Sequence, residues 1–255
     1  MMIVRERKKE FVMIEQHNHA QLSGMILSNW KSTLFQGESY RKSVELANYL
    51  HDIGWKEFDQ QPFWNDKVQA PYTFSDFPIH PKIVLYQHGI NEVEKRDLYA
   101  ALLCSEHYKR FLIQHTSIEA QSFVNEENRR QQCIRHRLEN VDKDLFDFHY
   151  RLLQFGDNLS LYLCLNEPGV TNQDIHPFFK NGIPLPEGIT TNSHLELTWT
   201  DENTVSLQDF PFEQPFTVTI KQKIVNKDEI AKKGLIQAYQ EEAMEEFPVQ
   251  LIPYN

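Results

Sequence analysis

The spacing of apolar residues through the first 165 positions constrains the fold of this chain more than any other feature. Six segments repeat apolar residues every three to four positions, as helices with one buried face do: 19–30, 39–51, 82–95, 97–114, 119–140 and 142–165. Asn18 and Ser39 are candidate N-caps of the first two segments, and Gly54 is expected to end the second. Helix is therefore the expected dominant state of this part of the chain.

Strand-like patterns are expected at the two ends of the chain. The apolar runs 3–4 and 11–14 flank a charged turn and predict a hairpin. After Asn166 a loop rich in Pro, Gly, Asn and Thr leads to expected strands at 194–200, 204–207 and 216–225. From Lys227 a helix is expected to about Glu246, followed by a short strand near 249–252.

These patterns predict a mainly α fold, a helical bundle with a small appended antiparallel β-sheet (α+β). The division expected is a helical core with an N-terminal hairpin at 1–165 and a small β-rich extension at 166–255. The sheet would be built from the tail, and the hairpin could join it.

The charge balance argues against some partners. With 36 acidic and 26 basic residues the formal charge is −10, so the molecule as a whole repels polyanions and nucleic acid is not an expected partner. The first residues carry charges where a signal peptide would be apolar, and no run approaches the roughly 18 apolar residues of a membrane span. We therefore expect a cytoplasmic protein without a membrane partner, and an oligomer stays open.

A His-Asp pair at the end of an apolar helix is the first sign of chemistry. His51 and Asp52, in the segment L-H-D-I-G, can bind one cation together, although a helix-end His beside a capping Asp is the simpler explanation. Two further residues favour a metal site. His19 opens the preceding helix, and Asp157 lies in a helix apolar almost all round, where a carboxylate is costly unless it is paired or bound to metal.

A His on one helix, a His-Asp pair ending the next and an Asp on a late helix resemble the HD superfamily of metal-dependent phosphohydrolases, over residues 17 to 165. The segments M-I-V-R, H-A-Q-L-S-G, L-H-D-I-G-W and S-E-H-Y also resemble a little-characterised bacterial family catalogued as a domain of unknown function. The HD resemblance implies an HD-like bundle in which His19, His51, Asp52 and Asp157 bind a divalent metal ion (Mn, Mg, Fe, Ni, Co or Zn). It implies hydrolysis of a small phosphorylated substrate, a phosphate ester such as a nucleotide, with Asp52 also orienting the attacking water.

The same resemblance points to further site residues. Members of the superfamily often place a basic residue or a Glu near the His-Asp pair for phosphate contact or proton transfer, and Lys56 and Glu57 are the nearest candidates. Dinuclear members add two His between the pair and the last Asp. Among the four candidates here His107 is the best, with a hydrogen-bonded core His as the alternative; the set is His80, His88, His107 and His115.

Alternatives to the hydrolase stay open. A non-catalytic ligand-binding or sensing module would keep the metal scaffold without an assured catalytic base, and a di-iron oxygenase would need two irons with extra His ligands. The aromatic-rich segment 55–81 could cover the metal as a lid or close the bundle as a plug. The mixed charges of the helix at 119–140 are those of a solvated face, from which a phosphate-binding Arg could also come.

Overall fold

The computed structural model describes residues 2–139 and 141–254 of the chain. Helices make up 49% and strands 20% of it, and six of the strands form one curled sheet. The expected mainly α fold, a helical bundle with a small appended antiparallel sheet, is therefore wrong, and the protein is an α/β mix. The reason is that strands from the two ends of the chain combine into one large sheet.

The six-stranded sheet brings together segments far apart in the sequence. In spatial order its strands are β1 (Ile3–Glu6), β2 (Glu10–Ile14), β9 (Phe216–Asn226), β10 (Glu245–Pro253), β8 (Thr204–Leu207) and β7 (Leu197–Asp201). The N-terminal hairpin is confirmed, and its second strand pairs antiparallel with β9. The sheet is mixed, not antiparallel, because β10 runs parallel to β8.

Eight helices are present in the described residues: α1 (Gln16–Ser28), α2 (Arg41–Leu50), α3 (Ile79–Glu94), α4 (Leu98–Leu112), α5 (Ile118–Leu138), α6 (Lys143–Leu165), α7 (Lys227–Lys233) and α8 (Leu235–Glu241). The single helix expected from Lys227 is thus two short ones, broken at Gly234, where φ is +82°. The helix expected at 119–140 includes residue 140, which lies outside the described residues.

The expected helix ends near the His-Asp pair are wrong. Asn18 lies inside α1, whose N-cap is Glu15, because the helix begins before the apolar periodicity does. Ser39 lies in a 3₁₀ turn, and α2 begins two residues later. Gly54 does not end α2. It lies in the next 3₁₀ turn (Ile53–Trp55), where a Cβ would stand 2.2 Å from the carbonyl oxygen of Leu85, so the residue is required for close approach to α3.

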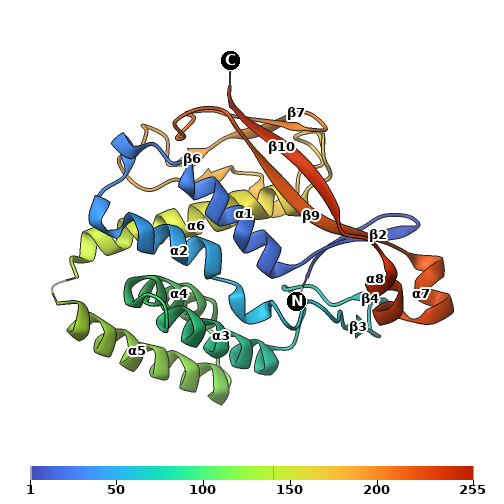
Figure 1. The fold of residues 1–255 in the computed structure, drawn as a ribbon, viewed down its shortest axis with the longest axis horizontal. Coiled ribbons are helices and arrows are strands. Elements are labelled where there is room, and N and C mark those ends of the chain that lie inside the picture. The colour runs from blue at the N-terminus through green and yellow to red at the C-terminus, as the bar shows by residue number, and fades with distance from the viewer. Residues whose placement is uncertain (1, 140, 255) are drawn as a thin grey trace.

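The elements form layers (Figure 1). The sheet lies on one side, α1 and α6 run beneath it, α2 follows, and α3, α4 and α5 make the far side. One continuous apolar core joins the helices to the inner face of the sheet, with Trp30, Phe155 and Phe212 in mutual edge or tilted contact. This arrangement fixes α1, α2 and α6 against one another.

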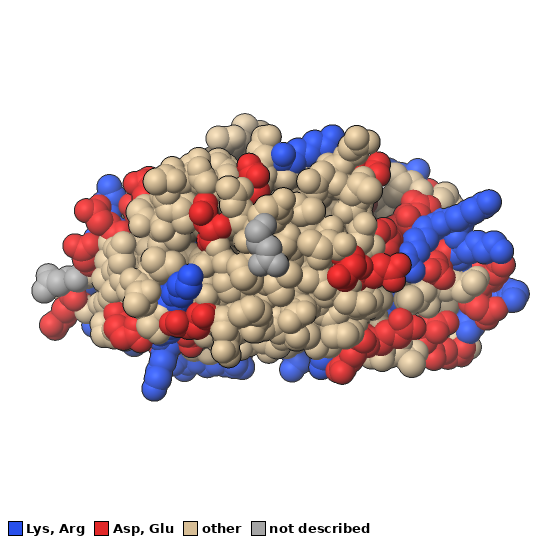
Figure 2. Space-filling view, turned by 90° about the horizontal axis from the view of Figure 1, so that it is seen from above, with Lys and Arg blue, Asp and Glu red and all other residues tan. Residues whose placement is uncertain are grey.

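The connections carry short strands and irregular chain. Between α2 and α3 lies the aromatic segment, with the two-residue strands β3 (Trp64–Asn65) and β4 (Ala70–Pro71). The loop after α6 contains β5 (Ile183–Pro184) and β6 (His194–Leu195). No helix in the described ranges is long and apolar enough to cross a membrane. Acidic and basic side chains are intermixed at both ends of the face seen in Figure 2, without a continuous basic surface there.

Candidate metal centre

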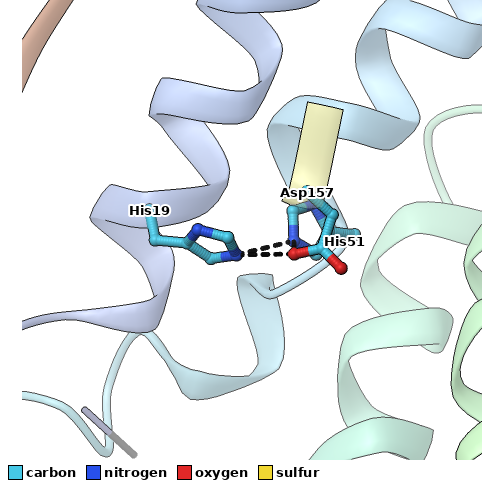
Figure 3. Close-up of side chains that lie close together, drawn as sticks. All are labelled: His19, His51 and Asp157. Carbon is cyan, nitrogen blue, oxygen red and sulfur yellow. Dashed lines mark hydrogen bonds and ion pairs between the residues drawn. The ribbon is translucent and has the colours of Figure 1, made fainter. Parts of the chain in front are cut away.

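Three side chains from three helices converge at the centre of the helical layer. His19 projects from α1, His51 caps the end of α2, and Asp157 projects from α6 (Figure 3). The Nε2 atom of His19 lies 2.9 Å from Asp157 Oδ1 and 3.2 Å from His51 Nε2, and His51 Nε2 lies 3.5 Å from Asp157 Oδ1. Each of the three offers one ligand atom within 4.8 Å of the others, so one cation could contact all three.

The second nitrogen of each imidazole is already engaged. His51 Nδ1 lies 2.8 Å from the carbonyl oxygen of Asn48, which can only accept, so the network assigns the ring proton to Nδ1. Ser160 Oγ donates to the Asp157 carbonyl at 2.8 Å and therefore accepts from His19 Nδ1 at 2.7 Å. In their neutral forms both rings thus direct a bare Nε2 lone pair at the same point, as metal-binding histidines with such partners do.

Asp52 lies beside this group. Its Oδ2 is 3.7 Å from His19 Nε2 and 3.6 Å from His51 Nε2, and its Oδ1 accepts a hydrogen bond of 2.6 Å from the hydroxyl of Tyr108. The same hydroxyl contacts the carbonyl oxygen of His51. Asp52 is not part of the group in which all ligand atoms lie within 4.8 Å of one another, so its place as a fourth ligand stays a prediction.

The electrostatics of the centre reflect this crowding of acceptors. Burial disfavours a charged imidazole, but the carboxylates of Asp52 and Asp157 outweigh it and raise the pKa of His51 to about 9. Burial would raise the pKa of Asp157, yet hydrogen bonding to the His19 and His51 rings holds it well below its usual range. The site therefore favours a positive charge between the ligand atoms, whether a proton or a metal ion.

His107 completes the buried surroundings. Its Nε2 lies 3.7 Å from Asp157 Oδ2, its ring lies edge-on to that of His51, and its Nδ1 is buried without a hydrogen-bond partner. Burial lowers the pKa of His107 to about 4, so the ring is neutral at pH 7. His107 thus lies beside the centre but is not one of the three grouped ligands. Its role as a ligand of a second metal ion stays a prediction.

A cavity of about 50 Å³ adjoins the ligand atoms. Its lining combines site residues with large aromatics: Gln16, His19, Asp52, Trp55, Phe74, Tyr86, His107, Tyr108, Phe111, Asp157 and Leu161. No Lys or Arg lines it in the part of the chain that the structure describes. A space of this size holds about four water-sized atoms, since one water needs roughly 10–15 Å³ by this measure.

The remaining candidates lie elsewhere. Lys56 and Glu57 are exposed and do not line the cavity. His80, His88 and His115 are exposed as well. In the aromatic segment Trp55 and Phe74 line the cavity wall, while Phe58 and Phe63 stack on each other at 5.9 Å and are about two-fifths exposed.

Four contributors escaped prediction from the sequence: Asn48, Ser160, Tyr108 and Gln16. Asn48 acts through a backbone carbonyl, which has no sequence signal. Ser160 could have been found, because it follows Asp157 by three residues and so lies on the same helical face. Tyr108 directly follows His107 in the sequence, and this position does not indicate that its hydroxyl would contact Asp52. Gln16 precedes the start that apolar spacing predicted for the first helix.

The donor set fits a divalent transition metal. Two imidazole nitrogens with one carboxylate, and a second carboxylate close by, suit Mn, Fe, Co, Ni or Zn better than Mg, which prefers oxygen ligands and water. When both imidazoles are neutral, only hydrogen-bond acceptor atoms meet at this point. A divalent transition-metal ion bound between them would relieve their repulsion.

A comparison with protein families matches one family model over residues 2–227, described as "Protein of unknown function (DUF3891)". No curated protein and no solved structure matches the chain.

Proposed function

The chain belongs to this DUF3891 family of unknown function, so its activity must be inferred from its own residues, and we propose that it is a metal-dependent hydrolase of phosphate esters. The observation that carries the proposal is the meeting of two imidazole Nε2 atoms and a carboxylate oxygen within 3.5 Å of one another, next to a small cavity. His19, His51, Asp52 and Asp157 would hold the metal, in the order of the HD superfamily pattern.

When bound, a divalent cation would supply an acidified water and neutralise charge that develops on phosphorus. His19 and His51 are fixed by Ser160 and Asn48, so little reorganisation is needed when the site fills. Asp52 is aimed in the same way by Tyr108, whose hydroxyl holds Oδ1, so Oδ2 faces the two Nε2 atoms, where it could contact the metal and orient the attacking water. Trp55 and Phe74 help exclude bulk water from the reacting group.

The test is a panel of phosphomonoesters and phosphodiesters assayed with Mn²⁺, Fe²⁺, Co²⁺, Ni²⁺, Zn²⁺ and Mg²⁺. We expect hydrolysis with one or more transition metals and its loss in Asp52→Asn, even where that variant keeps its metal. A filled metal site with no hydrolysis across the panel would rule the proposal out.

One observation favours a second candidate, a ligand-binding or sensing module without turnover. Among the described residues no cationic side chain lines the cavity, so a phosphate there would be neutralised by the metal alone. On this alternative the purified protein carries a small ligand that mass spectrometry finds unchanged after incubation with metal. Conversion of that ligand would favour the hydrolase. The di-iron oxygenase finds no such support, because the described residues contain one group of ligands and not two.

A further inference from the structure

The size of the metal cavity limits what it can enclose. About four water-sized positions match a phosphoryl group and leave no room for a sugar or a base. Any larger part of a substrate must therefore lie outside the cavity, along a surface that adjoins it.

A polar surface hollow of about 240 Å³ lies along α4 and α6, the helices that also contribute Phe111 and Asp157 to the cavity wall. Its lining residues are Arg110, Arg151, Gln154, Asn158, Pro184 and Leu185. Two pairs of chain neighbours place the two spaces at the same level of these helices. Arg110 lines the hollow and Phe111 the cavity, while Asn158 lines the hollow and Asp157 the cavity.

One face of α6 runs past both spaces. Arg151, Gln154 and Asn158 follow one another at helical spacing, and Leu161, three residues further, lines the cavity. From the first to the last of these residues the helix rises about 15 Å. The hollow and the metal centre therefore lie within the reach of one small extended molecule.

The two arginines of the hollow are available to an anion. Their side chains are 52% and 46% exposed, and each has a carboxylate partner, Glu106 at 2.7 Å from Arg110 and Glu187 at 2.8 Å from Arg151. The Arg151–Glu187 pair is exposed on both sides and contributes little, so a phosphate can replace that carboxylate. Glu106 is buried, and it keeps Lys109 at 2.6 Å when Arg110 turns toward a phosphate.

The planes of these groups suit an oxyanion. The Arg110 guanidinium lies over the Tyr150 ring at 4.7 Å, which restricts its orientation, and guanidinium binds phosphate through two parallel hydrogen bonds. Gln154 and Asn158 line the same hollow and add neutral donors to the two cations. Arg110 and Arg151 thus place positive charge outside the cavity, whose described lining contains no Lys or Arg.

We infer that the hollow lined by Arg110, Arg151, Gln154 and Asn158 binds a second phosphate group of the substrate whose first phosphoryl group enters the metal cavity. This rests on the proposed function and deepens it: the substrate class is a molecule with two separated phosphate groups.

The experiment compares two titrants that differ only in their far end, hexane-1,6-diol bisphosphate and 6-hydroxyhexyl phosphate. Both are titrated calorimetrically into Mn²⁺-loaded Asp52→Asn protein, in which turnover is prevented. The same titrations are made after adding Arg110→Gln, Arg151→Gln or both. Arg129→Gln, which removes one exposed charge from α5, is the matched control, and thermal melts check folding.

We expect the bisphosphate to bind at least about tenfold more tightly than the hydroxyl compound, as one charge-assisted anion contact provides. Each Arg→Gln change should reduce this preference severalfold, the double change should abolish it, and Arg129→Gln should leave it unaltered. Equal binding of the two titrants to the Asp52→Asn protein, or a preference that survives the double change, would overturn the inference. Because the ratio is measured without turnover, absence of hydrolysis in the separate assay counts against the proposed activity alone.

Discussion

The Nε2 atoms of His19 and His51 face each other at 3.2 Å, and the far nitrogen of each ring is tied to a partner that forces the lone pair toward the other ring. Two acceptors at this distance repel unless a positive charge lies between them. The carboxylates of Asp52 and Asp157 increase the demand for that charge.

Removal of a ligand should empty the site. We expect about one equivalent of transition metal in protein purified without chelator, and a loss of at least about 100-fold in metal affinity in His51→Ala and Asp157→Ala, more than the loss from changing a residue that only orients a ligand. Elemental analysis measures the first and competition with a chromophoric chelator the second. His80→Ala, at an exposed histidine, is the control and should keep its metal. Full metal content in both variants would show that His51 and Asp157 do not bind the metal.

Ser160→Ala tests the tether of His19. Without the hydroxyl, the Nδ1 of this ring loses its acceptor and the ring can turn, so we expect metal affinity to fall about 10- to 100-fold although every ligand is present. Ser122→Ala on α5, where the hydroxyl is exposed, should leave affinity unchanged. If the two variants bind metal alike, the tether does not position the ring.

Tyr108→Phe tests the orientation of Asp52. The change removes the hydrogen bond to Oδ1 and frees the carboxylate to rotate, so kcat should fall about tenfold or more while metal content is retained. Tyr49→Phe removes a hydroxyl from α2, outside the cavity, and serves as the control. Loss of metal in Tyr108→Phe together with activity would instead make Tyr108 a support of the metal ligands.

Metal affinity should depend on pH through His51. Because its pKa is raised to about 9, the metal-free site carries a proton at pH 7 that a metal ion must displace. Affinity should therefore rise about tenfold per pH unit and level off near pH 9. Protonated His51 stabilises the metal-free fold fully below its unfolded pKa near 6.5, and this contribution is lost as pH rises through about 9. Chelator competition between pH 6 and 8 is decisive, and a flat profile would contradict the proton displacement.

Gly156→Ala should disturb the centre without altering a ligand. A Cβ at this position would stand 2.3 Å from Asn48 Oδ1 and 2.8 Å from Ser23 Oγ, so α6 must move away from α1 and α2. We expect a destabilisation of about 1–3 kcal/mol, a lower Tm and weaker metal binding, because Asp157 moves with the helix. Gly188→Ala is the control. It has no neighbour within 4 Å and tests the cost of a positive φ alone, so it should leave metal affinity intact.

The sequence allowed the helices near the site to be located within a few residues, because α4, α5 and α6 begin at capping residues and keep one apolar face. It failed on the sheet. Strand pairing between β2 and β9 joins residues about 200 positions apart, and neither strand has a local sequence pattern that identifies its partner strand. The alternating patterns predicted strands but not that the hairpin would pair with β9.

The candidate site was also predictable only in part. The sequence singled out His19, His51 and Asp157 because a polar residue on an apolar helix needs a partner, and the structure brings these three side chains together. Lys56 is exposed and does not line the cavity, because nearness in sequence to Asp52 does not keep a side chain on the same side of a 3₁₀ turn, and its catalytic role stays a prediction. The arginines near the cavity come from α4 and α6, far from the pair in sequence, so only their positions in space connect them with it.

The pairing of β2 with β9 has a consequence for biosynthesis. Strand β2 leads into α1 through a single residue, so the helix that carries His19 is held in place by a strand that ends at Asn226. Those positions leave the ribosome roughly 200 residues apart, about 10 to 40 s at ordinary rates of elongation. During that interval His19 lacks its final support, and the ion should be acquired only after nearly all of the polypeptide has been synthesised.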